Sequence, residues 1–159
     1  MNSETSVSRT VTVNAPREHV FDVFTKHFDS WWPRSHKIGK AALASAVLEP
    51  REGGRWYERG VDGSECEWGR VLAYVPPSRV AVSWHLNAQF QYDPDPAKAS
   101  RVEVSFHAES STRTRVELVH SGLERHGEGW EKVRDSVGST GGWGDIIGQF
   151  AKQAEAAER

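Results

Sequence analysis

Residues 101–120, RVEVSFHAESSTRTRVELVH, alternate between apolar and polar side chains on both sides of a short polar turn. The apolar parity carries Val102, Val104, Phe106 and Ala108 before the turn, and Thr114, Val116, Leu118 and His120 after it. Strict period-two alternation is typical of a strand with one face on a core and one in water. The short connection favours antiparallel pairing. This stretch therefore predicts two strands of an antiparallel sheet.

The same kind of pattern occupies most of the chain before residue 101. Gly53-Gly54 and Asp62-Gly63 are turn signals. Pro76-Pro77 ends a strand, because proline cannot donate a hydrogen bond to a sheet. Together with the hairpin above, these segments predict a sheet of about six to seven strands. The other expected strands span residues 7–13, 41–49, 55–59, 65–75 and 79–87.

Helical spacing of apolar residues returns near both ends of the chain. A first helix is expected after Asn14 and Pro16, and a short second one over residues 29–33. Residues 130–137 form a short amphipathic pattern, and a longer helix is expected from about Trp143 to Ala154. The apolar stripe of that longer helix comprises Ile146, Ile147, Phe150, Ala151 and Ala154.

These elements define an α+β fold. A helix is about 10 Å across, whereas six or seven twisted strands form a much wider surface. The sheet is therefore expected to curl around the long C-terminal helix, and a curled sheet tends to leave a space beneath the helix. Residues 1–159 are expected to form a single domain with a core over about 7–154.

Charge and composition exclude several classes of partner. The net charge is −2, the pI is about 6.4 and no run of like charges is present, which argues against nucleic-acid binding. No apolar stretch approaches the roughly 18–20 residues that membrane insertion needs. The N-terminus is polar, and the single cysteine, Cys66, cannot form an internal disulfide. A cytoplasmic location is expected.

Four stretches of the sequence resemble a known family. They are VTVNAPREHVFDVFT (11–25), GGRWYERGVDGSECEWGRVLAYVPPSRVAVSW (53–84), SRVEVSFHAESSTRTRVELVHSGLERHGEGW (100–130) and GGWGDIIGQFA (141–151). Over residues 9–152 the chain resembles the SRPBCC/START-like helix-grip superfamily, in the branch of activator of Hsp90 ATPase homologue 1 (AHSA1-type). The resemblance implies a helix-grip (START/Bet v 1-like) fold. The superfamily includes ligand carriers, cyclases and chaperone co-factors, and no matching motif is catalytic.

Seven tryptophans in 159 residues are unusual, and aromatic side chains are favoured in the walls of ligand pockets. A mostly apolar pocket is expected between the sheet and the last helix; the alternative is that the tryptophans fill this space as a solid core. The candidate ligand-binding residues are Trp84, Phe106, Leu118 and His120 from strands, Trp143, Ile147 and Phe150 from the helix, and Trp32, Trp56 and Trp68 around the mouth.

Several polar residues have two interpretations. His120 has inward parity, so it either orients a ligand or acts as an acid or base, or it satisfies backbone groups where the strand ends. Glu58 and Arg70 form either an ion pair inside the cavity or an exposed cross-strand pair. His85 and His107 have outward parity and are expected in solvent.

No catalytic or metal-binding constellation is evident. The histidines lack the close spacing of zinc ligands, so no metal and no cofactor are expected. Cys66 lies between Glu65 and Glu67, which should raise the thiol pKa and make a nucleophile less reactive. The HGEG stretch at 126–129 is expected to supply a loop and a helix start.

Three functions fit the sequence. The first is binding of a small apolar or aromatic molecule in the cavity, without chemistry. The second is a cyclase- or hydrolase-type enzyme acting on a ring-containing substrate there. The third is an interaction domain associated with the chaperone Hsp90. A homodimer and a protein partner remain open alternatives.

Overall fold

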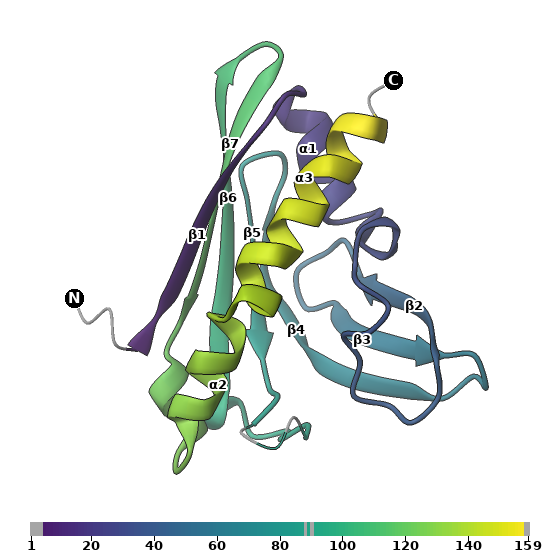
Figure 1. Cartoon of the computed structure of the whole chain (residues 1–159), viewed down its shortest axis with the longest axis vertical. Helices are drawn as coiled ribbons and strands as arrows, with labels where there is room; N and C mark the ends of the chain where they lie inside the picture. The colour runs from purple at the N-terminus through teal and green to yellow at the C-terminus, as the bar shows by residue number, and fades with distance from the viewer. Residues whose placement is uncertain (1–4, 88, 90, 158–159) are drawn as a thin grey trace.

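In the computed structural model, which describes residues 5–87, 89 and 91–157, seven strands form one antiparallel sheet (Figure 1). Their order is β1-β7-β6-β5-β4-β3-β2, so each strand from β2 to β6 pairs with its successor and β1 pairs with β7. The strands are β1 (Val7–Val13), β2 (Leu43–Leu48), β3 (Arg55–Gly60), β4 (Glu65–Val75), β5 (Arg79–Trp84), β6 (Ser100–Ser110) and β7 (Arg113–Ser121).

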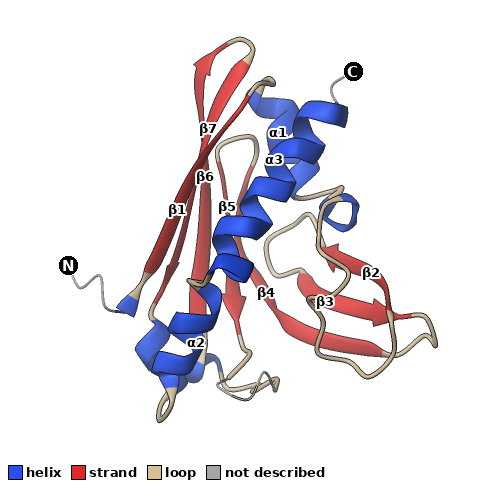
Figure 2. Ribbon diagram, in the orientation of Figure 1, coloured by secondary structure: helices blue, strands red, loops and turns tan. Residues whose placement is uncertain are grey.

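The helices lie on one face of this sheet. They are α1 (Arg17–Phe24), α2 (Trp130–Val137) and α3 (Asp145–Ala157). Figure 2 shows α3 crossing the concave side of the sheet, with α1 beside its C-terminal half. This arrangement confirms the expected α+β helix-grip fold. No helix among the described residues is both long and apolar enough to cross a membrane.

The β6–β7 hairpin follows the alternation of its sequence. Val102, Val104 and Phe106 are buried on the inner face of β6, and Val116 and Leu118 are buried on β7. The intervening residues carry the polar outer face, where His107 is exposed as expected and its ring contacts Glu117. Burial of this apolar face against α1 and α3 therefore sets the register of the strands.

An aromatic cluster fills the space between the sheet and the part of α3 around Phe150. The ring centroid of Phe150 on α3 lies 5.2 Å from that of Phe24 and 5.2 Å from that of Trp31. Phe24 in turn lies 5.8 Å from Phe106 on β6. Aromatic pairs at these distances stabilise one another beyond the area they bury. This half of the interior is therefore a solid core.

Strand β4 changes its alternation because one residue is inserted into its pairing with β3. Trp56 pairs with Gly69 and Tyr57 pairs with Glu67, so Trp68 is the extra residue between them. Such a bulge sends neighbouring side chains to faces that a simple alternation does not predict. Both Trp56 and Trp68 are consequently buried in the interior.

Gly69 is required where β4 approaches β5. A Cβ atom there would lie 1.7 Å from the carbonyl oxygen of Ser83, so any larger residue would force the strands apart. The amide of Arg70 donates to the Ser83 hydroxyl at 2.9 Å, and the amide of His85 donates to the Trp68 carbonyl at 2.9 Å. This close pairing brings Trp68 next to the end of β5.

Two local expectations were wrong. The short second helix expected over 29–33 is a single 3₁₀ turn at Phe28–Ser30. His85 is buried, because the chain after β5 folds back over it and Tyr92 packs against its ring. Its Nδ1–H donates to the carbonyl oxygen of Asp93 at 2.8 Å, a contact that strand parity alone cannot reveal.

Candidate functional site

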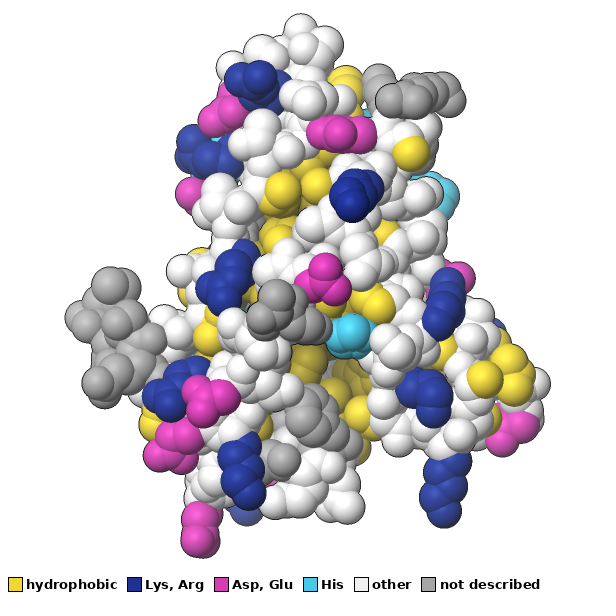
Figure 3. Space-filling model, in the orientation of Figure 1, with side chains coloured by type: hydrophobic (Ala, Val, Ile, Leu, Met, Phe, Trp, Pro, Cys, Tyr) yellow, Lys and Arg dark blue, Asp and Glu magenta, His cyan; other side chains and the backbone are white. Residues whose placement is uncertain are grey.

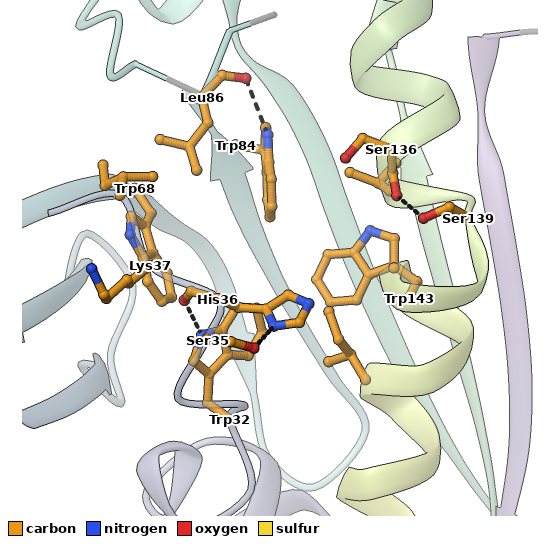
Figure 4. Close-up of a pocket in the computed structure, with 14 residues that line it drawn as sticks. Trp32, Ser35, His36, Lys37, Trp68, Trp84, Leu86, Ser136, Ser139 and Trp143 are labelled. Atoms are coloured by element: carbon orange, nitrogen blue, oxygen red, sulfur yellow. Dashed lines mark hydrogen bonds between the residues drawn. The ribbon is translucent and has the colours of Figure 1, made fainter. Parts of the chain in front are cut away.

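A cavity of about 310 Å³ opens between the loop that follows α1, the ends of β4 and β5, and the junction of α2 with α3 (Figure 4). In the space-filling view, apolar side chains lie at the bottom of a hollow on this face (Figure 3). The cavity is lined by Trp32, Ser35, His36, Lys37, Ile38, Trp68, Trp84, Leu86, Ser136, Val137, Ser139, Gly142, Trp143 and Ile146.

Four indoles dominate the wall, and each N–H group already has a partner inside the protein. Trp32 donates to the His36 carbonyl at 2.8 Å, and Trp84 donates to the Leu86 carbonyl at 3.2 Å. Trp68 donates to a carboxylate oxygen of Glu58 at 3.0 Å, and Trp143 donates to Nδ1 of His120 at 3.0 Å. These hydrogen bonds fix the rings, which therefore present their carbon surfaces to the cavity.

The kink between α2 and α3 places Trp143 in the wall. The chain turns at Gly142, where a Cβ atom would lie 2.2 Å from the carbonyl oxygen of Val137. Trp143 then packs at 5.8 Å from Trp84 and 6.3 Å from Trp32, measured between ring centroids. The turn therefore brings the indole of Trp143, on the helix side of the cavity, close to Trp84 on the strand side and to Trp32 on the loop side.

Glu58 on β3 is a buried carboxylate, with only 2% of its surface exposed. One oxygen accepts from the backbone N–H of Ile38 at 2.6 Å, and the other accepts from the N–H of Gly39 at 3.0 Å. Arg70 lies outside, where it pairs with Glu67 at 2.7 Å. Both interpretations of the Glu58–Arg70 pair were therefore wrong, because the bulge at Trp68 turns Arg70 to the surface.

His120 is fully buried behind Trp143 rather than on the cavity wall. Since the indole of Trp143 can only donate, Nδ1 of His120 accepts and Nε2–H donates to the Ser100 hydroxyl at 2.7 Å. The Ser100 hydroxyl then donates to Nε2 of His126 at 2.7 Å. Burial lowers the pKa of His120 to about 3, with a smaller contribution from His126, so the ring is neutral at pH 7.

The structure separates the ten sequence-derived candidates into two groups. Four of them line the cavity: Trp32, Trp68, Trp84 and Trp143. The other six are buried away from its wall: Trp56, Phe106, Leu118, His120, Ile147 and Phe150. Ile146, a member of the same helical stripe, faces the cavity in place of Ile147.

Sequence reasoning missed the loop from Ser35 to Ile38, which contributes four consecutive residues to the wall. The apolar and polar residues of this loop follow neither the helical nor the strand period, so the sequence does not indicate which side chains face inward. The sequence signals that bear on it are the inward parity of Glu58 and the glycine at position 39. A Cβ at Gly39 would lie 3.0 Å from a Glu58 carboxylate oxygen, so glycine allows the close approach.

Other reactive groups are sparse. Burial, followed by the charges of Glu58 and Asp62, raises the pKa of the Cys66 thiol. Among residues 5–87, 89 and 91–157, no group of three or more histidine, cysteine or acidic side chains is arranged to hold a metal ion. Glu65 and Glu67, which were expected to raise this pKa, are not among its causes and instead pair with arginines on the outer face.

A curved antiparallel sheet closed around a C-terminal helix, with an aromatic cavity beside that helix, defines a helix-grip protein. Within this class, the chain belongs to the family described as activator of Hsp90 ATPase homolog 1-like protein, whose model matches residues 14–155. No curated protein matches the chain.

Solved structures agree with this assignment. An anthrahydroquino-gamma-pyrone synthase, Txn09, is 39% identical, with a TM-score of 0.67 over 96% of this chain and 99% of that one. CalC, a self-sacrificing resistance protein from Micromonospora echinospora, is 30% identical, with a TM-score of 0.72 over 98% of this chain and 97% of that one. Protein NE0264 from Nitrosomonas europaea shares the fold at 16% identity and a TM-score of 0.67, covering 99% of this chain and 98% of that one.

Proposed function

We propose that this protein binds a small planar aromatic molecule in the cavity walled by Trp32, Trp68, Trp84 and Trp143. The observation that carries the proposal is that all four indole N–H groups are engaged inside the protein, so the rings present apolar surface. The cavity volume of about 310 Å³ falls in the range of small-molecule sites, roughly 300–1,000 Å³. Flat aromatic ligands match such walls because offset and edge-to-face ring contacts are favourable.

One relative supports a ligand of this class. Txn09 is named as a synthase of an anthrahydroquino-gamma-pyrone, a polycyclic aromatic product, and its sequence matches nearly the whole chain. CalC is named as a resistance protein. The shared element from which we argue is the helix-grip fold.

Substitution of Ile146 by tryptophan is the direct test. Ile146 lines the cavity, so a larger side chain there should occupy the volume and lower the affinity for 2-naphthol at least about tenfold, or about 1.4 kcal/mol. Equilibrium dialysis measures the dissociation constant without relying on tryptophan fluorescence. The matched control is Val61→Trp, which adds the same side chain at an exposed position and should leave the affinity unchanged.

Two results would contradict the proposal. One is the absence of saturable binding by the wild-type protein to 2-naphthol and to larger hydroxylated polycyclic probes. The other is an Ile146→Trp variant that unfolds like the wild type in denaturant and binds the probe equally well.

A second candidate is ring-closing catalysis on a polycyclic aromatic substrate. The observation in its favour is the 39% identity with a synthase over 96% of this chain. Incubation of the wild-type protein with an anthrahydroquinone that carries an open side chain, followed by mass spectrometry and comparison with an enzyme-free sample, tests it. No acceleration of ring closure would leave binding alone. The chaperone-associated alternative is supported by the family description only.

A further inference from the structure

We propose that Ser100 and His126 are positioning residues of the cavity, which act through His120 to hold the indole of Trp143 in the wall, so that protonation of His126 weakens ligand binding. The inference rests on the proposed function and adds to it a dependence of ligand affinity on pH. Ser100, His120 and His126 are not among the residues that line the cavity, whereas Trp143 is. Their effect on a ligand therefore passes through Trp143.

His120 supports two of the wall indoles from behind. Its Nδ1 accepts the N–H of Trp143 at 3.0 Å. Its ring centroid lies 6.1 Å from that of Trp143 and 5.1 Å from that of Trp84. All three side chains are buried. A change in the position of the His120 proton would therefore act directly on the cavity wall.

Four side chains form a hydrogen-bonded chain that runs in one direction. Trp143 donates to His120, and Nε2–H of His120 donates to the Ser100 hydroxyl at 2.7 Å. The Ser100 hydroxyl donates to Nε2 of His126, also at 2.7 Å. Hydrogen bonds arranged head to tail in a buried site strengthen one another. The chain leads from the cavity wall to His126, which is half-buried in the 3₁₀ turn η4 (Leu123–His126) after β7.

Protonation of His126 is incompatible with this direction. A protonated imidazole carries a proton on both nitrogens, so Nε2 of His126 would donate to Ser100 instead of accepting from it. The Ser100 proton then either loses its acceptor or turns toward Nε2 of His120. In the second case His120 carries its own proton on Nδ1, facing the N–H of Trp143. In both cases the chain loses one hydrogen bond, and Trp143 is held less firmly.

The surroundings of His126 keep it neutral at pH 7.5. Burial lowers its pKa below the ordinary value of 6.5, the neighbouring His85 lowers it further, and Asp93 raises it. His126 therefore takes up its proton only at a more acid pH. Other charged side chains on this turn and on the elements packed against it are partly or fully exposed, so solvent and salt screen them. They include Lys98, Arg101, Glu124, Arg125, Glu131 and Lys132.

NMR titration of the His126 ring, in the free protein and in protein saturated with 2-naphthol, is the first test. The probe stays neutral throughout, because a phenolic hydroxyl ionises at about pH 10. Loss of one hydrogen bond should weaken binding about five- to tenfold, and by reciprocity the ligand should then lower the pKa of His126 by about 0.7–1 pH unit. The exposed His107 serves as an internal reference, whose pKa should not change with ligand.

Equilibrium dialysis measures the same coupling as a change in affinity. One pH unit below the pKa of His126, the wild type should bind 2-naphthol about four- to fivefold more weakly than at pH 7.5. His126→Gln keeps an acceptor for Ser100 but does not titrate, so this fall should disappear. Effects of other titrating groups, including His36 in the wall, persist in the variant and are removed by the comparison. His107→Gln is the matched control and should keep the wild-type pH dependence.

Ser100→Ala interrupts the chain in its middle. His120 loses the acceptor of its Nε2–H and is no longer confined to the tautomer that accepts from Trp143. We expect about five- to tenfold weaker binding of 2-naphthol at pH 7.5, and a pH dependence no larger than that of His126→Gln. A merely structural role would lower stability in urea but leave the pH dependence of binding in place.

The outcomes separate this inference from the proposed function. If the wild type does not bind 2-naphthol or larger hydroxylated polycyclic probes, the proposed function fails and this inference fails with it. If the wild type binds but its ligand leaves the pKa of His126 unchanged, or His126 stays neutral down to pH 4.5, only the coupling is overturned. If His126→Gln removes the pH dependence but folded Ser100→Ala retains it, the role of Ser100 is overturned.

Discussion

Replacement of Phe150 by alanine is expected to lower the free energy of unfolding by about 3–5 kcal/mol. Phe150 is 0% exposed, and its ring packs against those of Phe24 and Trp31 at centroid distances of 5.2 Å. Truncation removes these contacts and leaves a void that surrounding rings fill only in part. Chemical denaturation monitored by circular dichroism measures the loss.

Ligand affinity provides a second readout of the same variant. Since Phe150 is not part of the cavity wall, the folded variant should bind 2-naphthol within about twofold of the wild type. Lys152→Ala, an exposed change on the same helix, is the control and should alter stability little. A loss below about 1 kcal/mol for Phe150→Ala would contradict the packed core.

Acid pH is expected to destabilise the protein through His120 by about 4–5 kcal/mol in total. The pKa of His120 is about 3 in the folded protein because of its burial, against 6.5 for an ordinary histidine. As the pH falls below 6.5, the unfolded chain binds a proton that the folded protein does not bind. The stabilisation is therefore complete above pH 6.5 and is lost progressively towards pH 3, at roughly 1.4 kcal/mol per pH unit.

Comparison with His120→Gln isolates this effect from the carboxylates that titrate over the same range. The glutamine variant is expected to be less stable at pH 7.5, because the contacts of Trp143 and Ser100 are rebuilt imperfectly. Between pH 7.5 and 4.5, urea denaturation should show the wild type losing about 2–3 kcal/mol more than the variant. Parallel pH profiles for the two proteins would be inconsistent with a neutral, buried His120.

The fold was predictable in large part because its signals are local. Alternation over residues 101–120 assigns Val104, Phe106 and Leu118 to the inner face without knowledge of any distant contact, and the structure buries all three. The apolar stripe on the last helix can be buried only against the apolar face of the sheet. A sheet curled around this helix was therefore predictable. The parity rule failed at Arg70, where the bulge at Trp68 shifts the strand by one residue.

The candidate site was predictable only as a set of inward aromatic residues. Inward parity places both Phe106 and Trp84 beneath the helices, but it does not say which of them faces packed atoms and which faces empty volume. That difference depends on the local separation of sheet and helix. Phe150 fills the space at one end, whereas the turn at Gly142 sets Trp143 against the open space at the other.

The sequence by itself determined the antiparallel sheet, the helix that it wraps and the aromatic character of the space between them, because the periods of strands and helices are local properties. The tertiary structure alone decided where the cavity lies and which loop forms part of its wall. Residues 35–38 of the wall lie on a loop that follows neither the helical nor the strand period. The position of this loop depends on Glu58, which accepts the backbone N–H of Ile38 from 20 positions further along the chain. Contacts between residues so far apart exist only after the sheet has folded.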